Sequence, residues 1–180
     1  MEYPAPAGRR GPFVASLVFV VTAMLLLMLL QSWVVSKRKM SRARCASNLM
    51  RIGMGLAMYA DDYNGRLPPP GTEGLGLMRD YLGTRAGSPF HCPVDRIRHE
   101  ADTNAPLDEA HCSYVYIGGV WARSSRSVDS ESQSKAVART VPVCWDKPEN
   151  HDNWGLNVLF NDGHLEWMDL GEWEKIRPDK

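Results

Sequence analysis

The chain of 180 residues lacks a net charge, since 21 lysines and arginines balance 21 aspartates and glutamates. A chain without an excess of either sign has no overall field that attracts nucleic acid or acidic ligands, so we predict no nucleic-acid partner. The sequence also contains no Gly-x-Ser-x-Gly, no His-Glu-x-x-His and no phosphate-binding glycine loop. These are common signatures of hydrolases, metalloproteases and nucleotide-binding enzymes. The sequence therefore predicts no catalytic residue and a protein that is not an enzyme.

Charge is missing altogether from one long stretch, Phe13 to Val35, which Arg9-Arg10 precedes and Lys37-Arg38-Lys39 follows. At a rise of about 1.5 Å per residue, a helix over these residues crosses the roughly 30 Å hydrocarbon core of a bilayer. The run is longer than a secretory signal core, and no Ala-x-Ala cleavage site follows it. We therefore predict a retained transmembrane helix over residues 13–35, after a short basic leader over residues 1–12.

An apolar stripe continues beyond this predicted span. Its members recur at alternating spacings of four and three, which is the periodicity of one helix face: Cys45, Leu49, Ile52, Leu56, Tyr59 and Tyr63. No proline interrupts this stretch, and Gly53 and Gly55 are its only weak points. We predict one helix of about 50 residues, amphipathic over residues 36–64. It should end near Asn64-Gly65, a pair suited to a left-handed cap ahead of the prolines at 68–70.

Residues 65–180 are predicted to form a globular head with an antiparallel sheet. Strands are expected over 112–120, 140–145, 156–161 and 164–169, a short helix around 75–82, and a solvated Ser-rich loop over 123–135. Asp162-Gly163 suits a two-residue type I′ turn, which would pair Phe160 with Leu165 and Val158 with Trp167 on one face. Because the helical stripe can cover such a face, the predicted fold class is α+β.

The four cysteines leave several arrangements open. Cys92 and Cys112 each follow a histidine, and His91, Cys92, His111 and Cys112 are a ligand set that zinc accepts. Two observations argue against a zinc site: neighbouring residues on a strand point to opposite faces, and C-x-x-C spacing is absent. A Cys92–Cys112 disulfide and buried thiols are the alternatives. Cys45 is expected to be a core residue of the helix, and Cys144 is an alternative disulfide partner.

Several motifs together resemble type II secretion pseudopilins and type IV pilin-like proteins. Arg44 to Leu49 with Tyr59 to Pro68, Phe90 to Asp95, and Trp145 to Gly163 are similar to the planctomycete-type prepilin-like family with a C-terminal His-x9-Asp-Gly pattern. Here ten residues separate His151 from Asp162, and we assign the extra one to the turn around residues 152–155. The residues that carry the resemblance are Cys45, Asn48, Leu49, Cys92, Pro93, Asp95, His151, Asp162 and Gly163.

The resemblance implies a lollipop-like fold, with a long N-terminal helix capped by the sheet. It also implies a C-terminal loop that often binds calcium in secretion pseudopilins. Carboxylates around the last hairpin offer the oxygen ligands that calcium prefers: Asp146, Glu149, Asp152 and Asp162. Asp162 has a sufficient role as a turn residue, and residues 152–153 as a loop. We therefore expect no obligatory cofactor and retain calcium as the candidate ion.

The N-terminus departs from the family pattern. Prepilins usually carry a glycine before the processing site and a glutamate a few residues into the apolar run. Here Pro12 follows Gly11, which is a poor context for cleavage, and Ser16 stands where the glutamate would fall. In a pilus that glutamate is thought to pair with a neighbour's N-terminal amine. Its absence from this chain leaves both cleavage at Gly11 and filament assembly open.

The resemblance implies a membrane-anchored structural subunit of a type II secretion or type IV pilus-like assembly, whose transmembrane helix packs against other copies or other pseudopilins. The alternative is an anchored extracytoplasmic binding module that uses the sheet face or the 123–135 loop and never polymerises. A metal-dependent enzyme comes third. Five basic residues in 37–44 follow the predicted span and only Arg9 and Arg10 precede it. Because basic residues are enriched on the cytoplasmic side of a membrane, this excess favours a cytoplasmic head. The resemblance instead implies a single-pass inner-membrane protein with a periplasmic head. We follow the resemblance.

Overall fold

A computed structural model describes residues 11–83, 88–95, 97, 106–119 and 141–178, with side chains described from residue 14 on. Gly11 and Pro12 begin its first helix, but the remainder of the predicted leader lies outside the described residues. The predicted 123–135 loop also lies outside them.

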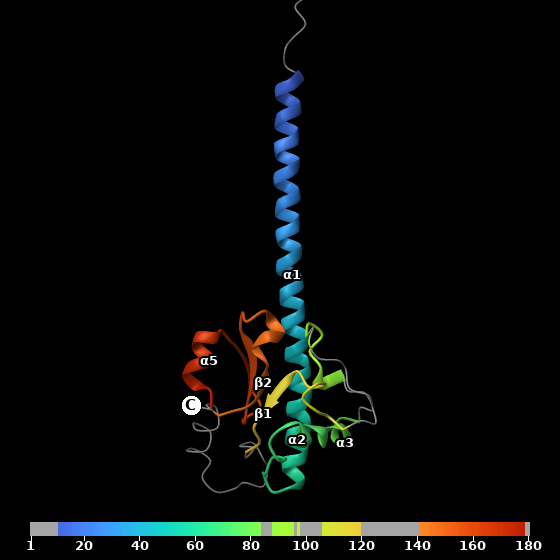
Figure 1. Ribbon diagram of the computed structural model, residues 1–180, viewed down its shortest axis with the longest axis vertical. Helices are drawn as coiled ribbons and strands as arrows, with labels where there is room; N and C mark the ends of the chain where they lie inside the picture. Colours follow the sequence, from blue (N-terminus) through green and yellow to red (C-terminus); the bar gives the residue numbers. More distant parts are fainter. Residues whose placement is uncertain (1–10, 84–87, 96, 98–105, 120–140, 179–180) are drawn as a thin grey trace, which may run out of the picture. The chain divides into compact units, whose positions relative to one another are not determined.

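The first helix, α1 (Gly11–Asp62), runs without a break (Figure 1). It ends where predicted, because Asn64 and Gly65 take left-handed backbone conformations, with φ of 57° and 84°. The Gly65 amide donates to the Ala60 carbonyl at 2.7 Å and so satisfies one of the last carbonyl groups of the helix. The single long helix expected from the apolar run and the following stripe is confirmed.

The chain divides into two compact units, residues 1–40 and residues 41–180. In the first unit, the large apolar side chains of α1 between residues 14 and 35 are exposed, from 43% at Val34 to 74% at Phe19. In the described part of the chain, α1 is the one helix long and apolar enough to cross a membrane. Exposed apolar side chains of this kind are stable in lipid, so this segment is compatible with membrane anchoring.

The second unit contains a four-stranded antiparallel sheet in the order β1-β2-β3-β4. Its strands are β1 (Tyr114–Tyr116), β2 (Pro142–Asp146), β3 (Leu156–Phe160) and β4 (Leu165–Met168). All four fall inside or within one residue of the predicted ranges. Together with α1, the sheet makes the fold α+β, as predicted (Figure 1).

The register of the last hairpin differs from the prediction by one residue. Leu159 lies opposite Leu165, and Val158 lies opposite Glu166. The hairpin connection has three residues rather than two, because the Gly163 amide donates to the Phe160 carbonyl and the Phe160 amide donates to the His164 carbonyl. Gly163 has φ 84°, which is typical of the last residue in such a three-residue connection. Because the connection has one more residue than expected, Leu159 and not Val158 lies on the sheet face that carries Leu165.

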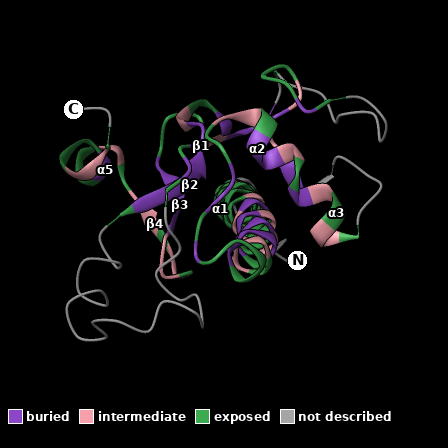
Figure 2. Cartoon of the chain, turned by 90° about the horizontal axis from the view of Figure 1, so that it is seen from below, coloured by how far each residue is buried: buried purple, intermediate pink, exposed green. Residues whose placement is uncertain are grey.

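The face of the sheet that carries Leu159 packs on α1. Figure 2 shows buried residues along this part of α1, beside the strands and α2 (Thr72–Gly76). Four members of the predicted stripe, Cys45, Leu49, Ile52 and Leu56, have no exposed surface, and neither has Ala60, whereas the predicted member Tyr59 is half-buried. Tyr63, predicted as the last member, is 51% exposed. At Gly53 a Cβ would lie only 3.2 Å from the Leu159 side chain, so the glycine allows the close approach of helix and strand.

The opposite face of the sheet is covered by α5 (Leu170–Ile176), a helix that we did not predict. Trp173 of α5 packs at 4.8 Å between ring centroids on Trp145 of β2, in a cluster with Leu156, Val158 and Phe160. Asp169 and Glu172 form a capping box at the start of α5. This acidic pair, three residues apart ahead of an apolar residue, was the available sequence signal for the helix.

Short helices connect these elements. In place of the one helix expected around 75–82 there are two, α2 and α3 (Met78–Leu82). A 3-10 turn, η1 (Ser88–Phe90), precedes Cys92, and a second, η2 (Pro148–His151), follows β2.

The packing of α1 on the sheet predicts a sharp difference between two neighbouring residues. Leu49 is fully buried, whereas Met50 is 58% exposed. We expect Leu49→Ala to lower the free energy of unfolding by about 2–5 kcal/mol, because it opens a cavity in the core. Met50→Ala is the matched control and should change it by less than about 0.5 kcal/mol. Denaturant unfolding of the full chain in detergent, followed by near-ultraviolet circular dichroism, measures both. Equal losses for the two variants would contradict this packing.

Candidate functional site

Several of the residues that carry the resemblance lie where α1 meets the segment around η1, whereas Asp162 and Gly163 lie at the β3–β4 turn. Cys45 of α1 forms a disulfide with Cys92, with Cα atoms 5.3 Å apart, and both residues are fully buried. One turn further along α1, the Asn48 side-chain amide donates to the His91 carbonyl at 2.9 Å. A covalent bond and a hydrogen bond thus hold the 88–95 segment against the same face of the helix.

This disulfide corrects the predicted Cys92–Cys112 pairing. Cys45 was expected to be a core residue, and it is buried, but its role as the partner of Cys92 was missed. Cys112 and Cys144 are buried thiols outside the disulfide, and the Cys112 thiol lies 3.4 Å from the Tyr114 carbonyl that accepts from it. Burial raises the pKa of the Cys144 thiol well above its ordinary value, and the neighbouring Cys112 and Asp146 raise it further. Cys144 therefore stays a protonated core residue.

Asp95 connects the same segment to the sheet. Its carboxylate, 8% exposed, accepts a hydrogen bond from the Ser113 hydroxyl at 2.7 Å and another from the Ile97 amide at 2.9 Å. The Ser113 amide in turn donates to the Phe90 carbonyl at 2.8 Å. Pro93 lies between Cys92 and Asp95 and is exposed. Asp95 thus satisfies buried donors beside β1, a role that explains a carboxylate at this position.

A second buried carboxylate, Asp146 at the end of β2, organises the opposite side of the site. Its Oδ2 accepts from the Asn157 side-chain amide at 2.6 Å, from the Asn157 backbone amide at 3.0 Å and lies 3.0 Å from the His151 Nε2. Asp146 has no exposed surface, and its Oδ1 has no hydrogen-bond partner in the described part of the chain. The pKa of the nearby Tyr114 is raised well above its ordinary value. The chief cause is burial of the side chain, and the charge of Asp146 raises the pKa further.

Asn157 extends this cluster to the helix. Its side-chain amide also lies 3.4 Å from the Arg42 carbonyl of α1, and the Arg42 guanidinium lies 4.2 Å from the centroid of the Trp167 ring on β4. Burial lowers the pKa of Arg42. The contacts of Asn157 therefore join β3 and Asp146 to the first buried turn of α1.

The η2 turn places His151 against Asp146. The Asn150 side-chain amide donates to the Ser113 carbonyl at 2.7 Å, and the Lys147 ammonium donates to the Cys112 carbonyl at 2.9 Å and to Glu109 at 2.7 Å. Asp152 and Asn153 then take left-handed conformations, with φ of 54° and 56°. This stretch is where we placed the extra residue relative to the His-x9-Asp-Gly pattern.

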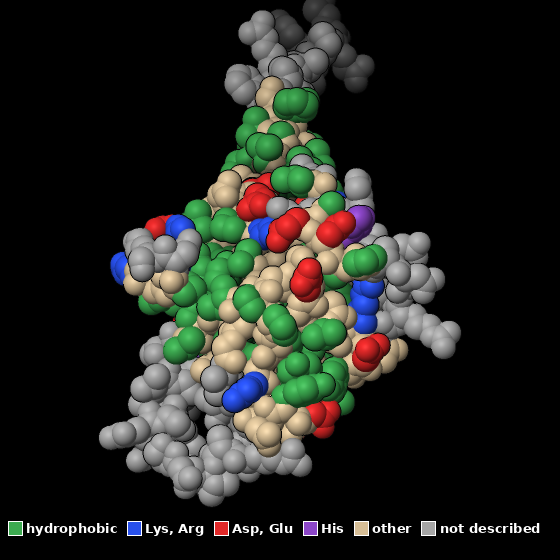
Figure 3. All heavy atoms as spheres, turned by 60° about the horizontal axis from the view of Figure 1, so that its bottom comes forward, with side chains coloured by type: hydrophobic (Ala, Val, Ile, Leu, Met, Phe, Trp, Pro, Cys, Tyr) green, Lys and Arg blue, Asp and Glu red, His purple; other side chains and the backbone are tan. Residues whose placement is uncertain are grey.

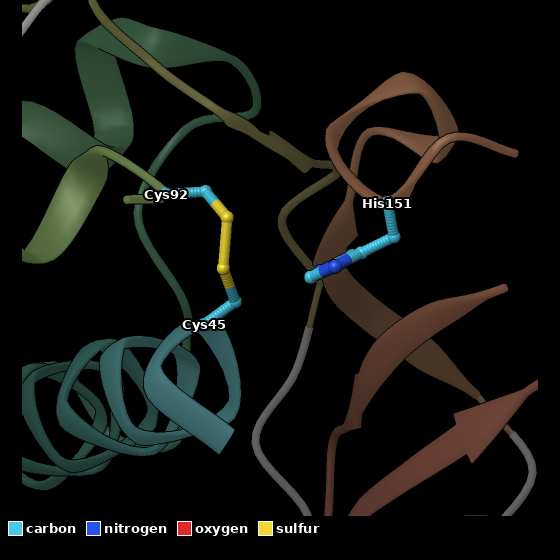
Figure 4. A group of neighbouring side chains, drawn as sticks. All are labelled: Cys45, Cys92 and His151. Atoms are coloured by element: carbon cyan, nitrogen blue, oxygen red, sulfur yellow. A yellow bond between two sulfur atoms is a disulfide. The ribbon is translucent and has the colours of Figure 1, made fainter. Parts of the chain in front are cut away.

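His151 brings a third group to the disulfide (Figure 4). The Cys45 and Cys92 sulfurs and a ring nitrogen of His151 all lie within 4.8 Å of one another. Among the described residues this is the one group of three or more His, Cys, Asp or Glu side chains with metal-ligand proximity. The pairs proposed from sequence, His91-Cys92 and His111-Cys112, do not form such a group, and the His111 ring instead bonds Asp108 at 2.6 Å.

The four carboxylates considered for calcium do not come together either. Asp146 is buried beside Asn157 at the start of β3, whereas Glu149 and Asp152 are exposed. Asp162 lies beyond the other end of β3, where its Oδ1 accepts from the His164 amide at 3.1 Å and bonds the His164 ring. Asp162 and Gly163 therefore shape the hairpin turn, and the predicted calcium ligand set is not assembled.

Comparisons with known protein families, with curated proteins and with solved structures found no match for this chain.

The hydrogen bonds of Asp146 predict a specific cost when its charge is removed. In Asp146→Asn an NH2 group replaces one carboxylate oxygen. Its N–H donors would be buried, and the Oδ1 position already has no hydrogen-bond partner in the described part of the chain. The charge that strengthens the bonds to Asn157 and His151 is also lost. We expect the free energy of unfolding to fall by about 1–3 kcal/mol.

Asp152→Asn is the matched control, because it makes the same chemical change at an exposed residue in a conformation that asparagine tolerates. Denaturant unfolding of the full chain in detergent compares the two variants. The assignment of Asp146 as a structural connector fails if both variants unfold at the wild-type denaturant concentration.

Proposed function

We propose that this chain is a membrane-anchored structural subunit, similar to pseudopilins, of a type II secretion or type IV pilus-like assembly. The supporting observation is that the two parts of α1 have different surroundings. Its first part exposes large apolar side chains, and its second part is buried against a four-stranded antiparallel sheet. The buried motif residues serve as connectors within the head. That pattern suits a protein whose work is assembly rather than turnover.

The proposed assembly contact lies on one face of the apolar part of α1. In lipid, helices associate through close packing at small residues rather than through the hydrophobic effect. Ser16 and Ala23, seven residues apart, lie on one helix face, with Phe19 between them. The Thr22 hydroxyl donates to the Val18 and Phe19 carbonyls at 2.9 Å, so it leaves no unsatisfied donor in lipid. We assign the Ser16–Ala23 face to contact with neighbouring subunits.

The proposed location is the inner (cytoplasmic) membrane, with the head in the periplasm. The Lys37 ammonium lies 3.8 Å from the centroid of the Trp33 ring, and this pairing suits the boundary between the bilayer and water. A buried Cys45–Cys92 disulfide supports an oxidising compartment for the head, since disulfides persist there and are rare in the cytosol. We give this chemistry more weight than the basic residues at 37–44, which by the charge rule favour a cytoplasmic head.

The alternative, an anchored module that binds a partner through its sheet, has less support. Among the described residues, one sheet face packs on α1 and the other packs on α5, so both faces already have partners within the head. The face of the molecule drawn in Figure 3 carries acidic, basic and apolar side chains. The 123–135 loop, the other surface assigned to this alternative, lies outside the described residues.

Site-specific photo-cross-linking in native membranes tests the assembly contact. A photoreactive phenylalanine derivative replaces Phe19 on the Ser16–Ala23 face or, as the control, Leu25 on the opposite face. We expect cross-linked dimers or complexes with other small membrane subunits from position 19, and much weaker products from position 25. Ala23→Leu should reduce the products from position 19 several-fold, because the larger side chain prevents close helix approach.

Cross-linking to lipid alone at both positions, with the protein monomeric, would contradict the proposal. It would favour an anchored module that does not assemble.

A further inference from the structure

We propose that Cys45, Cys92 and His151 form a zinc site when the disulfide between the two cysteines is reduced. The head would then have two stable forms, one closed by a disulfide and one closed by a metal ion. This inference rests on the buried cluster itself and does not depend on the proposed assembly function.

The three side chains come from separate parts of the head and point to one place (Figure 4). Cys45 belongs to α1, Cys92 follows η1, and His151 ends η2. Their ligand atoms lie within 4.8 Å of one another, so small side-chain movements bring all three within bonding distance of one ion. Both cysteines are fully buried, and the His151 side chain is 6% exposed.

Two sulfurs and one imidazole nitrogen form a ligand set that zinc prefers, with bonds of roughly 2.3 Å and 2.0–2.1 Å. Three protein ligands leave a fourth position for water. Calcium and magnesium, which take oxygen ligands, do not suit this donor set. The chemistry of the cluster therefore selects a borderline or soft cation.

Asp146 prepares His151 for this role. Its Oδ2 lies 3.0 Å from the His151 Nε2, and a carboxylate there holds the proton on Nε2 and leaves the Nδ1 lone pair for a metal. Asp146 is itself held by two hydrogen bonds from Asn157. This carboxylate–imidazole arrangement is the usual support for a metal-bound histidine. Asp146 is a positioning residue, since it acts through His151.

The negative charge of the reduced cysteines, Cys45 and Cys92, favours binding of a zinc ion. Two thiolates beside the buried Asp146 would place several negative charges in a region without exposed surface, which is costly. A divalent cation offsets the two thiolate charges. Reduced Cys45 and Cys92 therefore either remain protonated thiols or bind metal.

A dithiol reductant gives two electrons and two protons to the disulfide, and its own sulfurs form a new disulfide. Cys45 and Cys92 become thiols. Zinc binding then displaces the two thiol protons to solvent. Oxidation by a disulfide of the same class reverses the sequence and releases the ion.

The test uses the full chain in detergent, with Cys112→Ser and Cys144→Ala to remove the other two thiols. The protein is reduced with a dithiol, freed of reductant without oxygen, and titrated with cobalt(II) and then with zinc. We expect one cobalt ion per chain, with a thiolate-to-cobalt charge-transfer band, and displacement by one zinc ion. The oxidised protein should bind neither ion at this site.

Three variants in that background assign the ligands. Cys45→Ser leaves one thiolate, so it should weaken binding and lower the charge-transfer intensity to half or less, and His151→Ala should change the cobalt spectrum and weaken binding. Asp146→Asn should weaken binding about 10–100-fold while both thiolate bonds persist, as expected for a group that orients a ligand. Asp152→Asn, an exposed neighbour, should leave the affinity unchanged.

A second measurement needs no variant that risks misfolding. In the reduced wild-type chain, zinc should protect Cys45 and Cys92 from alkylation and reoxidation, as mapped by peptide mass spectrometry. The proposal is overturned if the reduced protein binds no stoichiometric cobalt, or if His151→Ala leaves the spectrum unchanged. It is equally overturned if the oxidised protein binds the ion as tightly as the reduced one.

Discussion

The head depends on the packing of the second half of α1 against the sheet, and the Cys45–Cys92 disulfide fixes that packing in place. The bond closes a sequence separation of 47 residues, for which loop-closure entropy predicts a stabilisation of about 4 kcal/mol. It also positions the segment around η1, since Cys92 lies directly after that turn. Because Leu49, Ile52 and Leu56 are buried on the same helix face, the covalent link and the hydrophobic core act in the same direction.

Polar side chains complete this arrangement by forming hydrogen bonds between separate segments of the head. Asn48 connects α1 to His91, Asp95 connects the η1 segment to Ser113, and Asp146 connects β2 to His151 and Asn157. Each of these side chains is a short polar group with a defined partner, as buried polar groups require. Their presence is explained by folding, and the same geometry brings His151 to the disulfide. Structure and the proposed metal chemistry therefore share one set of residues.

Much of the fold could be predicted because its signals are local. The absence of charge over 13–35, the helical stripe from Cys45 and the Asn64-Gly65 cap all act within a few turns of one helix. The errors concern choices that local patterns leave open. Both two-residue and three-residue connections accommodate Asp162-Gly163, and only the hydrogen bonds of Phe160 decide between them. Likewise, the choice of Cys45 over Cys112 depends on how α1 meets the η1 segment, which is a tertiary contact. The α5 helix was missed although its capping box is visible in the sequence.

The most direct test of this account is to map the disulfide in protein isolated from membranes after thiols are blocked in intact cells. Digestion without reductant and mass spectrometry would then identify the linked peptides. The account predicts a Cys45–Cys92 link, with Cys112 and Cys144 as thiols. A Cys92–Cys112 link would contradict the packing of α1 on the η1 segment. Four blocked thiols without zinc would contradict both the disulfide and the oxidising location proposed for the head.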